Sequence, residues 1–177
     1  MTSLLLDTDL SKEQRDFAEL ARQSADFMLN LVDDILDFSK IEAGHLELEL
    51  IHFNIHTTVN DVAELMTVKA FEKGLQFSNI VGKDVPTVLK GDPGRLRQIL
   101  LNLVNNALKF TKKGTVSVHV ELEKENDTNC TLRFAITDTG ISIPKNRINR
   151  LFQSFSQVDA SIYRDYGGTG LGLAISK

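Results

Sequence analysis

A row of amide and ammonium side chains on one predicted helix is suited to binding a metal ion and phosphate. Asn102 and Asn106 lie four positions apart, which places them on one helix face, and Lys109 follows about one turn later. Together with Asn105 they make three asparagines within five positions, although asparagine is disfavoured in helix interiors. Mg²⁺ prefers hard oxygen ligands and commonly takes only one or two from protein when phosphates supply the rest. The alternative is a solvated polar face, but such faces usually carry Glu and Lys, so we favour metal and phosphate binding.

Two glycine-containing segments are suited to a close approach by a ligand. Asp138 ends a predicted strand before Thr139 and Gly140, so its carboxylate can accept hydrogen bonds from a ligand. The segment from Gly167 to Leu173 has four glycines within six residues at a predicted helix start, where backbone N–H groups can bind an anion. No Gly-Lys-Ser/Thr follows, so it is not a Walker A loop. It also follows no strand of a βαβ unit, which argues against a dinucleotide-binding fold.

The N-terminal part of the chain is predicted to be mainly one long helix. Ser11 and Gln14 form a capping-box pattern at its start, and Gly44 is a natural end. Ser3–Leu6 is expected to be the last turn of an earlier helix, so we favour half of a helical hairpin over a single helix lying on a domain. The apolar stripe recurs at spacings of three and four; it consists of Phe17, Leu20, Ala21, Ser24, Phe27, Met28, Leu31, Ile35 and Phe38.

The rest of the chain is predicted to alternate between strands and helices. A helix with one buried stripe and one polar face is the strongest of these elements, and Pro93 is at its favoured first position. Its stripe comprises Leu96, Ile99, Leu100, Leu103, Ala107 and Phe110. In chain order we expect a strand at 46–50 running toward Ile55, a helix to 73–74, a strand at 75–81, a loop at 82–94, the helix at 93–110, strands at 115–123 and 131–138, a short helix at 144–152, a loop at 153–168 and a helix start at 170–177.

Composition limits the classes of function. The chain of 177 residues is 42% hydrophobic and 25% charged, as in soluble globular proteins. Its formal net charge of −4 argues against a nucleic-acid-binding protein. The one cysteine, Cys130, excludes an internal disulfide framework and fits a reducing compartment. No apolar run approaches the roughly 18 residues of a membrane span, and we find no signal peptide, so we expect a cytoplasmic chain.

Four segments resemble motifs of the histidine-kinase ATPase family, in that family's order. They are Asn102–Ala107 with Lys109–Thr111 (resembling the N box), Asp138–Ile141 (first glycine box), Phe152–Phe155 (F box) and Gly168–Gly172 (second glycine box). Leu36–Gly44 further resembles the end of the second helix of that family's dimerisation hairpin.

The resemblance implies an α/β fold, a two-layer α/β sandwich with a mixed β-sheet of the Bergerat type, preceded by a long hairpin helix. The expected domains are a partial dimerisation hairpin at 1–44 and an ATP-binding domain at 45–177. In the family's pattern a closing helix and two strands would follow residue 177, so we expect the sequence to be part of a longer protein.

The resemblance also implies roles for individual residues toward ATP and Mg²⁺. Asn106 would bind Mg²⁺, Asn102 and Lys109 would contact the phosphates, and Asp138 would accept a hydrogen bond from the adenine amino group. Gly140 would let the base lie close to the backbone. Residues 153–168 would form a lid over ATP. The remaining residues implied to bind ATP are Phe152, Arg164, Gly168, Thr169, Gly170, Leu171 and Gly172, with Arg164 reaching the terminal phosphates and the glycines surrounding them.

This sequence departs from the family's pattern at two places that concern function. Ser142 stands where the first glycine box usually has its second glycine. The family's phosphoacceptor histidine belongs to the first hairpin helix, and none of the four histidines here has its sequence setting, so no catalytic residue is assigned. His52 and His56 lie four positions apart, but we expect them in a strand and a loop, as surface residues rather than a metal pair.

We therefore predict the ATP-binding part of a two-component sensor histidine kinase. The full protein would transfer the γ-phosphoryl group to a histidine and then to an aspartate of a response-regulator receiver domain. The expected partners are that receiver domain and a second copy of the chain bound through the N-terminal helix. The alternatives are an anti-sigma regulator of the serine-kinase type, which lacks such a hairpin, and a degenerate nucleotide-binding module without catalysis.

Overall fold

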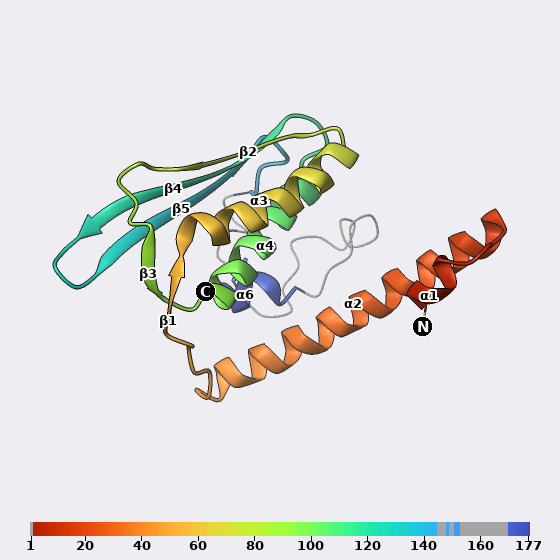
Figure 1. Cartoon of the computed structure of the whole chain (residues 1–177), viewed down its shortest axis with the longest axis horizontal. Coiled ribbons are helices and arrows are strands. Elements are labelled where there is room, and N and C mark those ends of the chain that lie inside the picture. Colours follow the sequence, from red (N-terminus) through yellow and green to blue (C-terminus); the bar gives the residue numbers. More distant parts are fainter. Residues whose placement is uncertain (1, 145–147, 149–150, 153–169) are drawn as a thin grey trace. The chain divides into compact units, whose positions relative to one another are not determined.

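The computed structural model describes residues 2–144, 148, 151–152 and 170–177. The chain divides into two compact units, Met1–Leu46 and Glu47–Lys177. Figure 1 shows a long helix in the first unit and helices packed on a sheet in the second. No described helix is long and apolar enough to cross a bilayer.

The first unit is a short helix followed by a long one. α1 (Thr2–Leu6) ends in a turn where Thr8 donates to the carbonyl of Leu5, and α2 spans Lys12–Glu42. The predicted capping box is confirmed, because the backbone N–H of Ser11 donates to Gln14 Oε1 and that of Gln14 to Ser11 Oγ. Gly44 follows α2 with φ of +68°, a conformation that favours glycine. Ala18 is the buried residue of α2, so its apolar stripe is mostly exposed.

A mixed three-stranded sheet forms one layer of the second unit. Its order is β2 (Gln76–Val81), β4 (Thr115–Glu125) and β5 (Cys130–Asp138). β2 pairs with β4 in parallel and β4 pairs with β5 antiparallel, with Val118 opposite Ile136. Alternate residues of β4 face the core and are buried, namely Val116, Val118 and Val120. The predicted mixed sheet is confirmed.

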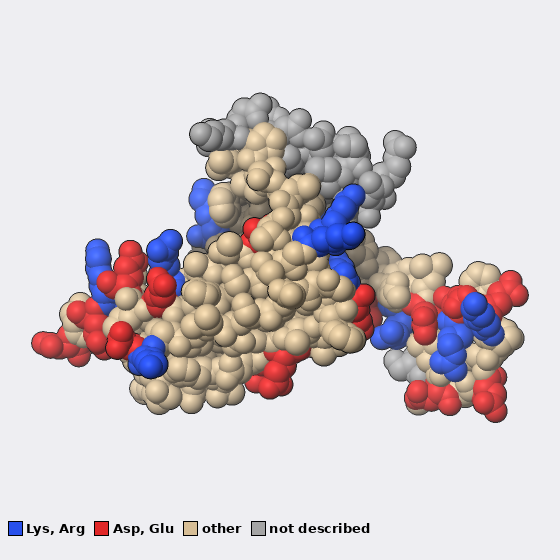
Figure 2. Space-filling view, turned by 90° about the horizontal axis from the view of Figure 1, so that it is seen from above, with Lys and Arg blue, Asp and Glu red and all other residues tan. Residues whose placement is uncertain are grey.

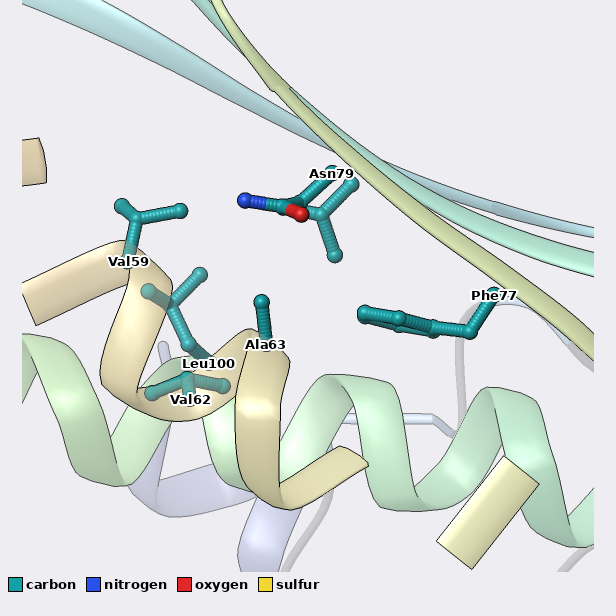
Figure 3. A pocket seen from close by; sticks show the side chains of 7 residues that line it. Val59, Val62, Ala63, Phe77, Asn79 and Leu100 are labelled. Carbon is teal, nitrogen blue, oxygen red and sulfur yellow. The ribbon is translucent and has the colours of Figure 1, made fainter. Parts of the chain in front are cut away.

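Two helices form the other layer, on one side of this sheet (Figure 1). α3 (Ile55–Glu72) contacts β2, while α4 (Pro93–Phe110) contacts α3, β4 and β5. The shared core includes Ile55, Val59, Val62, Met66, Ala70, Leu100, Val104 and Leu108. Side chains fill the space between α3 and the sheet: the void beside Asn79, bordered by Val59, Ala63 and Phe77, has no room for a water molecule (Figure 3). The predicted two-layer α/β sandwich is confirmed.

Two predictions on the segments before α4 are only partly correct. The strand predicted at 46–50 and running toward Ile55 is present only in its last part, as β1 (Ile51–Asn54), and the segment predicted as a loop at 82–94 contains β3 (Val88–Gly91). Among the described strands, these two pair with each other and with no third, with Ile51 opposite Gly91 and Asn54 opposite Val88. Leu48 and Leu50 are exposed and pair with no described strand. The alternation of apolar and acidic residues at 46–50 therefore did not identify the residues that form the strand. His56, expected in a loop, lies in the first turn of α3.

The predicted stripe of α4 is only partly correct. Leu100 and Ala107 are buried, but so are Val104 and Leu108, which the stripe left out. Ile99, Leu103 and Phe110 are half-buried instead. The core side of α4 faces both α3 and the sheet, so its centre is rotated away from the asparagines, and the three half-buried residues flank the polar face.

The C-terminal predictions are tested only in part. Of the short helix predicted at 144–152, Pro144, Leu151 and Phe152 are not helical, Ile148 is in 3₁₀ conformation, and the others lie outside the described residues. The loop predicted at 153–168 also lies outside them. The helix expected at 170–177 is α6 (Gly172–Ile175).

Asp92 joins the start of α4 to the segment that precedes β1. Its Oδ1 accepts from the backbone N–H of Arg95 at 2.9 Å, which caps the helix, and its Oδ2 accepts from that of Glu49 at 3.1 Å. The bond from Arg95 is the main reason why the pKa of Asp92 lies below its ordinary value. One carboxylate therefore satisfies two backbone donors 46 positions apart in the chain, the difference between residues 95 and 49.

We expect Asp92→Ala to lower the free energy of unfolding by about 0.5–2 kcal/mol at neutral pH, the usual effect of losing a helix cap. Because the folded pKa is depressed, this contribution is complete above the ordinary carboxyl pKa and is lost as the pH falls through the lowered value. Denaturant unfolding of parent and variant as a function of pH measures it. Asp84→Ala removes the same charge from an exposed turn; an equal loss there would contradict the cap assignment.

Candidate functional site

Two asparagines on the polar face of α4 differ in their hydrogen bonds to the rest of the protein. Asn105 points toward α3, where its Oδ1 accepts from Lys69 Nζ at 3.2 Å. Asn106 is half-buried, and its side chain makes no hydrogen bond within the part of the chain that the structure describes. An amide oxygen is a hard ligand, so Asn106 fits a contact to a hard cation.

Lys109 lies at the C-terminal end of α4 in a partly desolvated setting. Its Nζ is 5.1 Å from the centroid of the Phe110 ring. Burial lowers the pKa of Lys109, and the positive charge of Lys73 lowers it further. Lys73 is itself held at this end, because its Nζ donates to the carbonyl of Leu108 at 3.2 Å. Two ammonium groups that repel each other favour an anion nearby, which would stabilise both charges.

The Asp138–Gly140 turn is fastened to the C-terminal end of α4. Its own hydrogen bond runs from the Gly140 N–H to Asp138 Oδ1 at 2.8 Å. The N–H of Ile141 donates to the Phe110 carbonyl at 3.3 Å. A Cβ on Gly140 would lie 2.4 Å from that carbonyl oxygen and 2.8 Å from Thr111 Oγ1. Position 140 therefore requires glycine for packing within the protein, whatever binds beside it.

The segment Gly170–Gly172 approaches the middle of α4. A Cβ on Gly172 would lie 2.3 Å from Asn102 Oδ1 and 2.7 Å from its Nδ2. Asn102 Nδ2 donates to Ser176 Oγ at 2.9 Å, and that hydroxyl donates to the Gly172 carbonyl, also at 2.9 Å. Gly170 has φ of +70° and Leu171 is fully buried. The close approach of Gly172 and the bond to Ser176 thus attach this turn to α4.

α4 brings most of the described candidate residues into one region. Asn102, Asn106 and Lys109 belong to it, and the turns at Gly140 and at Gly170–Gly172 pack against it. Phe152 is half-exposed, with no described contact to this region, and Ser142 is exposed. The predicted site residues Arg164, Gly168 and Thr169 lie outside the described residues.

Sequence reasoning missed two polar residues here. Ser176 lies four positions after Gly172, the spacing at which a serine hydroxyl bonds a helical carbonyl, but nothing in the sequence linked it to Asn102. Thr111 is 3% exposed, and its hydroxyl has no hydrogen-bond partner among the described atoms. A threonine directly after a helix gives no sign of such burial.

Charge is not concentrated in one sign on the face shown in Figure 2. Acidic and basic side chains mix at the end of the β4–β5 hairpin, while the middle of this face of the second unit is largely uncharged. Among the described residues, no group of three or more His, Cys, Asp or Glu side chains is arranged to hold a metal. An anion or cation site here would therefore depend on local groups such as those of α4 rather than on the overall field.

Gly140→Ala is expected to destabilise the protein by about 1–3 kcal/mol, since the added methyl group meets a backbone carbonyl that cannot move independently. Thermal or denaturant unfolding measures the change. Gly91→Ala is the matched control, because its Cβ would make only an ordinary contact, 3.4 Å from the Phe53 ring. If both variants unfold alike, the close approach of the turn to α4 is not a constraint on stability.

Two family models match the chain. The Histidine kinase-, DNA gyrase B-, and HSP90-like ATPase model matches residues 91–177, and the His Kinase A (phospho-acceptor) domain model matches residues 1–44. Together they include the glycine turns, α4 and α2.

The chain is also similar to curated kinases and solved structures. Sensor protein GacS of Pseudomonas syringae pv. syringae is 46% identical over 176 residues, 99% of this chain and 19% of GacS. Signal transduction histidine-protein kinase BarA of Escherichia coli K12 is 45% identical over 176 residues, which are 99% of this chain and 19% of BarA. The chain thus spans about a fifth of the length of these curated relatives. Full-length ShkA in complex with AMPPNP superposes with a TM-score of 0.77 at 39% identity, covering 99% of this chain and 35% of ShkA. These matches show that the chain belongs to the histidine kinase family and carries that family's ATPase domain.

Proposed function

We propose that residues 47–177 bind ATP with Mg²⁺ as the nucleotide-binding part of a two-component sensor histidine kinase. The observation that carries the proposal is the packing of Gly172 against Asn102 and of Gly140 against Phe110, both on α4, the helix that also carries Asn106 and Lys109. This places an amide oxygen, an ammonium group and close-packed backbone in one region, as a triphosphate requires. ShkA, which shares the fold at 39% identity, is described in complex with AMPPNP, an ATP analogue. We assign this function to the cytoplasm, which supplies ATP.

Asn106 and Lys109 are the proposed contacts to the metal and the phosphates. The amide oxygen of Asn106 accepts no hydrogen bond within the described residues, so it can bind a cation. Bound Mg²⁺ would neutralise charge on the phosphates. Lys109 offers an ammonium whose pKa is lowered by burial and by Lys73, so a phosphate beside it would favour its charged form. Gly168, Thr169, Gly170, Leu171 and Gly172 are proposed to surround the phosphates. Phe152 is a further proposed contact to ATP, and Arg164, from the proposed lid at 153–168, is proposed to reach the terminal phosphates.

Asp138 is the proposed contact to the base. Its Oδ1 accepts from the Gly140 N–H, and its side chain is exposed, so Oδ2 remains for the exocyclic amine of adenine. Guanine has a carbonyl at the same position, and a carboxylate cannot donate to it. The site therefore favours ATP over GTP through a single hydrogen bond.

The proposed reaction moves the γ-phosphoryl group of ATP to a histidine nitrogen. The bond between the γ-phosphorus and the bridging oxygen breaks, a P–N bond forms, and ADP leaves; the group then passes to an aspartate of a response-regulator receiver domain. The protein contributes positioning and charge neutralisation rather than a covalent group of its own in this domain. The match of residues 1–44 to the His Kinase A model favours this function over the anti-sigma regulator, which lacks the hairpin.

Asn106→Ala is expected to weaken ATP binding in the presence of Mg²⁺ by about 1–3 kcal/mol, the usual loss for a charge-assisted contact, and to change adenosine binding little. Isothermal calorimetry measures both ligands. Asn105→Ala is the control, because the neighbouring amide faces Lys69 on α3. Equal losses for ATP and adenosine would mean that Asn106 supports only the fold.

We also propose that α2 joins two copies of the chain. Phe17, Leu20 and Phe27 are exposed, and an apolar face of this length is uncommon on a monomer. Phe27→Glu combined with Leu31→Glu should give a monomer that still binds nucleotide, as measured by light scattering. Arg22→Glu makes the same change in net charge on the opposite side of α2 and should leave the dimer intact. A parent chain that is monomeric at high concentration would contradict this assembly.

A further inference from the structure

Both polar atoms of the Asn102 side chain lie close to residues of the α6 segment. Nδ2 donates to Ser176 Oγ at 2.9 Å, and the amide lies against Gly172 so closely that a Cβ there would be 2.3 Å from Oδ1. The side chain of Asn106, one turn later on α4, makes no hydrogen bond within the described residues. The two asparagines share a helix face but meet different surroundings.

From this geometry we propose that Asn102 and Ser176 form a clasp that holds the Gly170–Gly172 turn on α4. Asn102 is then a positioning residue that acts on ATP through the turn, rather than a contact to phosphate. The Ser176 hydroxyl is central to the clasp, because it accepts from Asn102 and donates to the Gly172 carbonyl. The inference rests on the proposed function, since it assigns how the second glycine turn is held for the nucleotide.

The described contacts of the turn are tertiary ones. The N-cap residue of α6, Leu171, makes no side-chain capping bond but is fully buried. The Asn102–Ser176 bond joins α6 to α4, so it helps to set the position of the turn.

Glycine at position 172 completes the arrangement. Any side chain there would displace the Asn102 amide and with it the bond to Ser176. The glycine of this motif thus serves the contact between two motifs of the chain. The two hydrogen bonds of the clasp use side-chain atoms and one carbonyl.

A double-mutant cycle with Asn102→Ala and Ser176→Ala tests the clasp. Each single change should weaken ATP binding with Mg²⁺ by about 2- to 10-fold, the range for one lost hydrogen bond, and change adenosine binding by less than about twofold. The double variant should be no weaker than the weaker single variant, because both remove the same interaction. Ser176→Thr retains the hydroxyl and should restore most of the affinity, and Ser78→Ala, on an exposed strand position, should have no effect.

Effects that add in the double variant would overturn the inference and return Asn102 to a direct phosphate contact. Hydrogen exchange provides a readout that needs no nucleotide: each single variant should speed exchange of the Ile175 and Ser176 amides, which bond to Leu171 and Gly172. Unchanged exchange would also overturn the clasp. A parent chain that binds no ATP, but shows this faster exchange in the variants, would refute the proposed function and leave the clasp intact.

Discussion

The close approach of two glycines to one helix is the constraint on which the site depends. At Gly140 a methyl group would meet the Phe110 carbonyl oxygen at 2.4 Å, and at Gly172 it would meet Asn102 Oδ1 at 2.3 Å. Both turns come from segments far from α4 in sequence. At Gly140 the neighbouring atoms include the Phe110 backbone, whereas at Gly172 they belong to the Asn102 side chain, which a larger residue would displace. The polar face of α4 and the two turns are therefore packed closely together.

Further contacts hold α4 as a rigid base for these turns. Leu100 and Val104 lie in the core between α3 and the sheet. Arg97 forms an ion pair with Asp61 of α3, although both side chains are partly exposed, so its contribution is modest. Asp92 caps the helix and binds the segment before β1 through the same carboxylate.

Local patterns in the sequence were sufficient for most of the fold. The capping box at Ser11 and Pro93 at the start of α4 each act over a few residues, and each was predicted correctly. The strand predicted at 115–123 is also confirmed, as β4. The pairing of β1 with β3 was missed, because only a distant strand distinguishes Ile51–Asn54 from the alternating residues before it. For the same reason the buried side of α4 was misplaced by part of a turn.

The candidate site shows the same division between local and distant information. The residue types of the motifs indicated a nucleotide, but not that Asn105 would face Lys69 or that Asn102 would bond to Ser176. Gly140 was expected to make room for a base, whereas its nearest neighbours are atoms of Phe110 and Thr111. Motif resemblance identifies which residues matter, and packing decides which of them remain available to a ligand.

We propose above all that α4 and its two glycine turns form the binding site for ATP with Mg²⁺. Calorimetric titration of the unmodified chain with ATP and with GTP, each with and without Mg²⁺, tests it most directly. The account predicts saturable binding of ATP that strengthens when Mg²⁺ is present, and markedly weaker binding of GTP. Equal binding of the two nucleotides, or ATP binding that is indifferent to Mg²⁺, would contradict it.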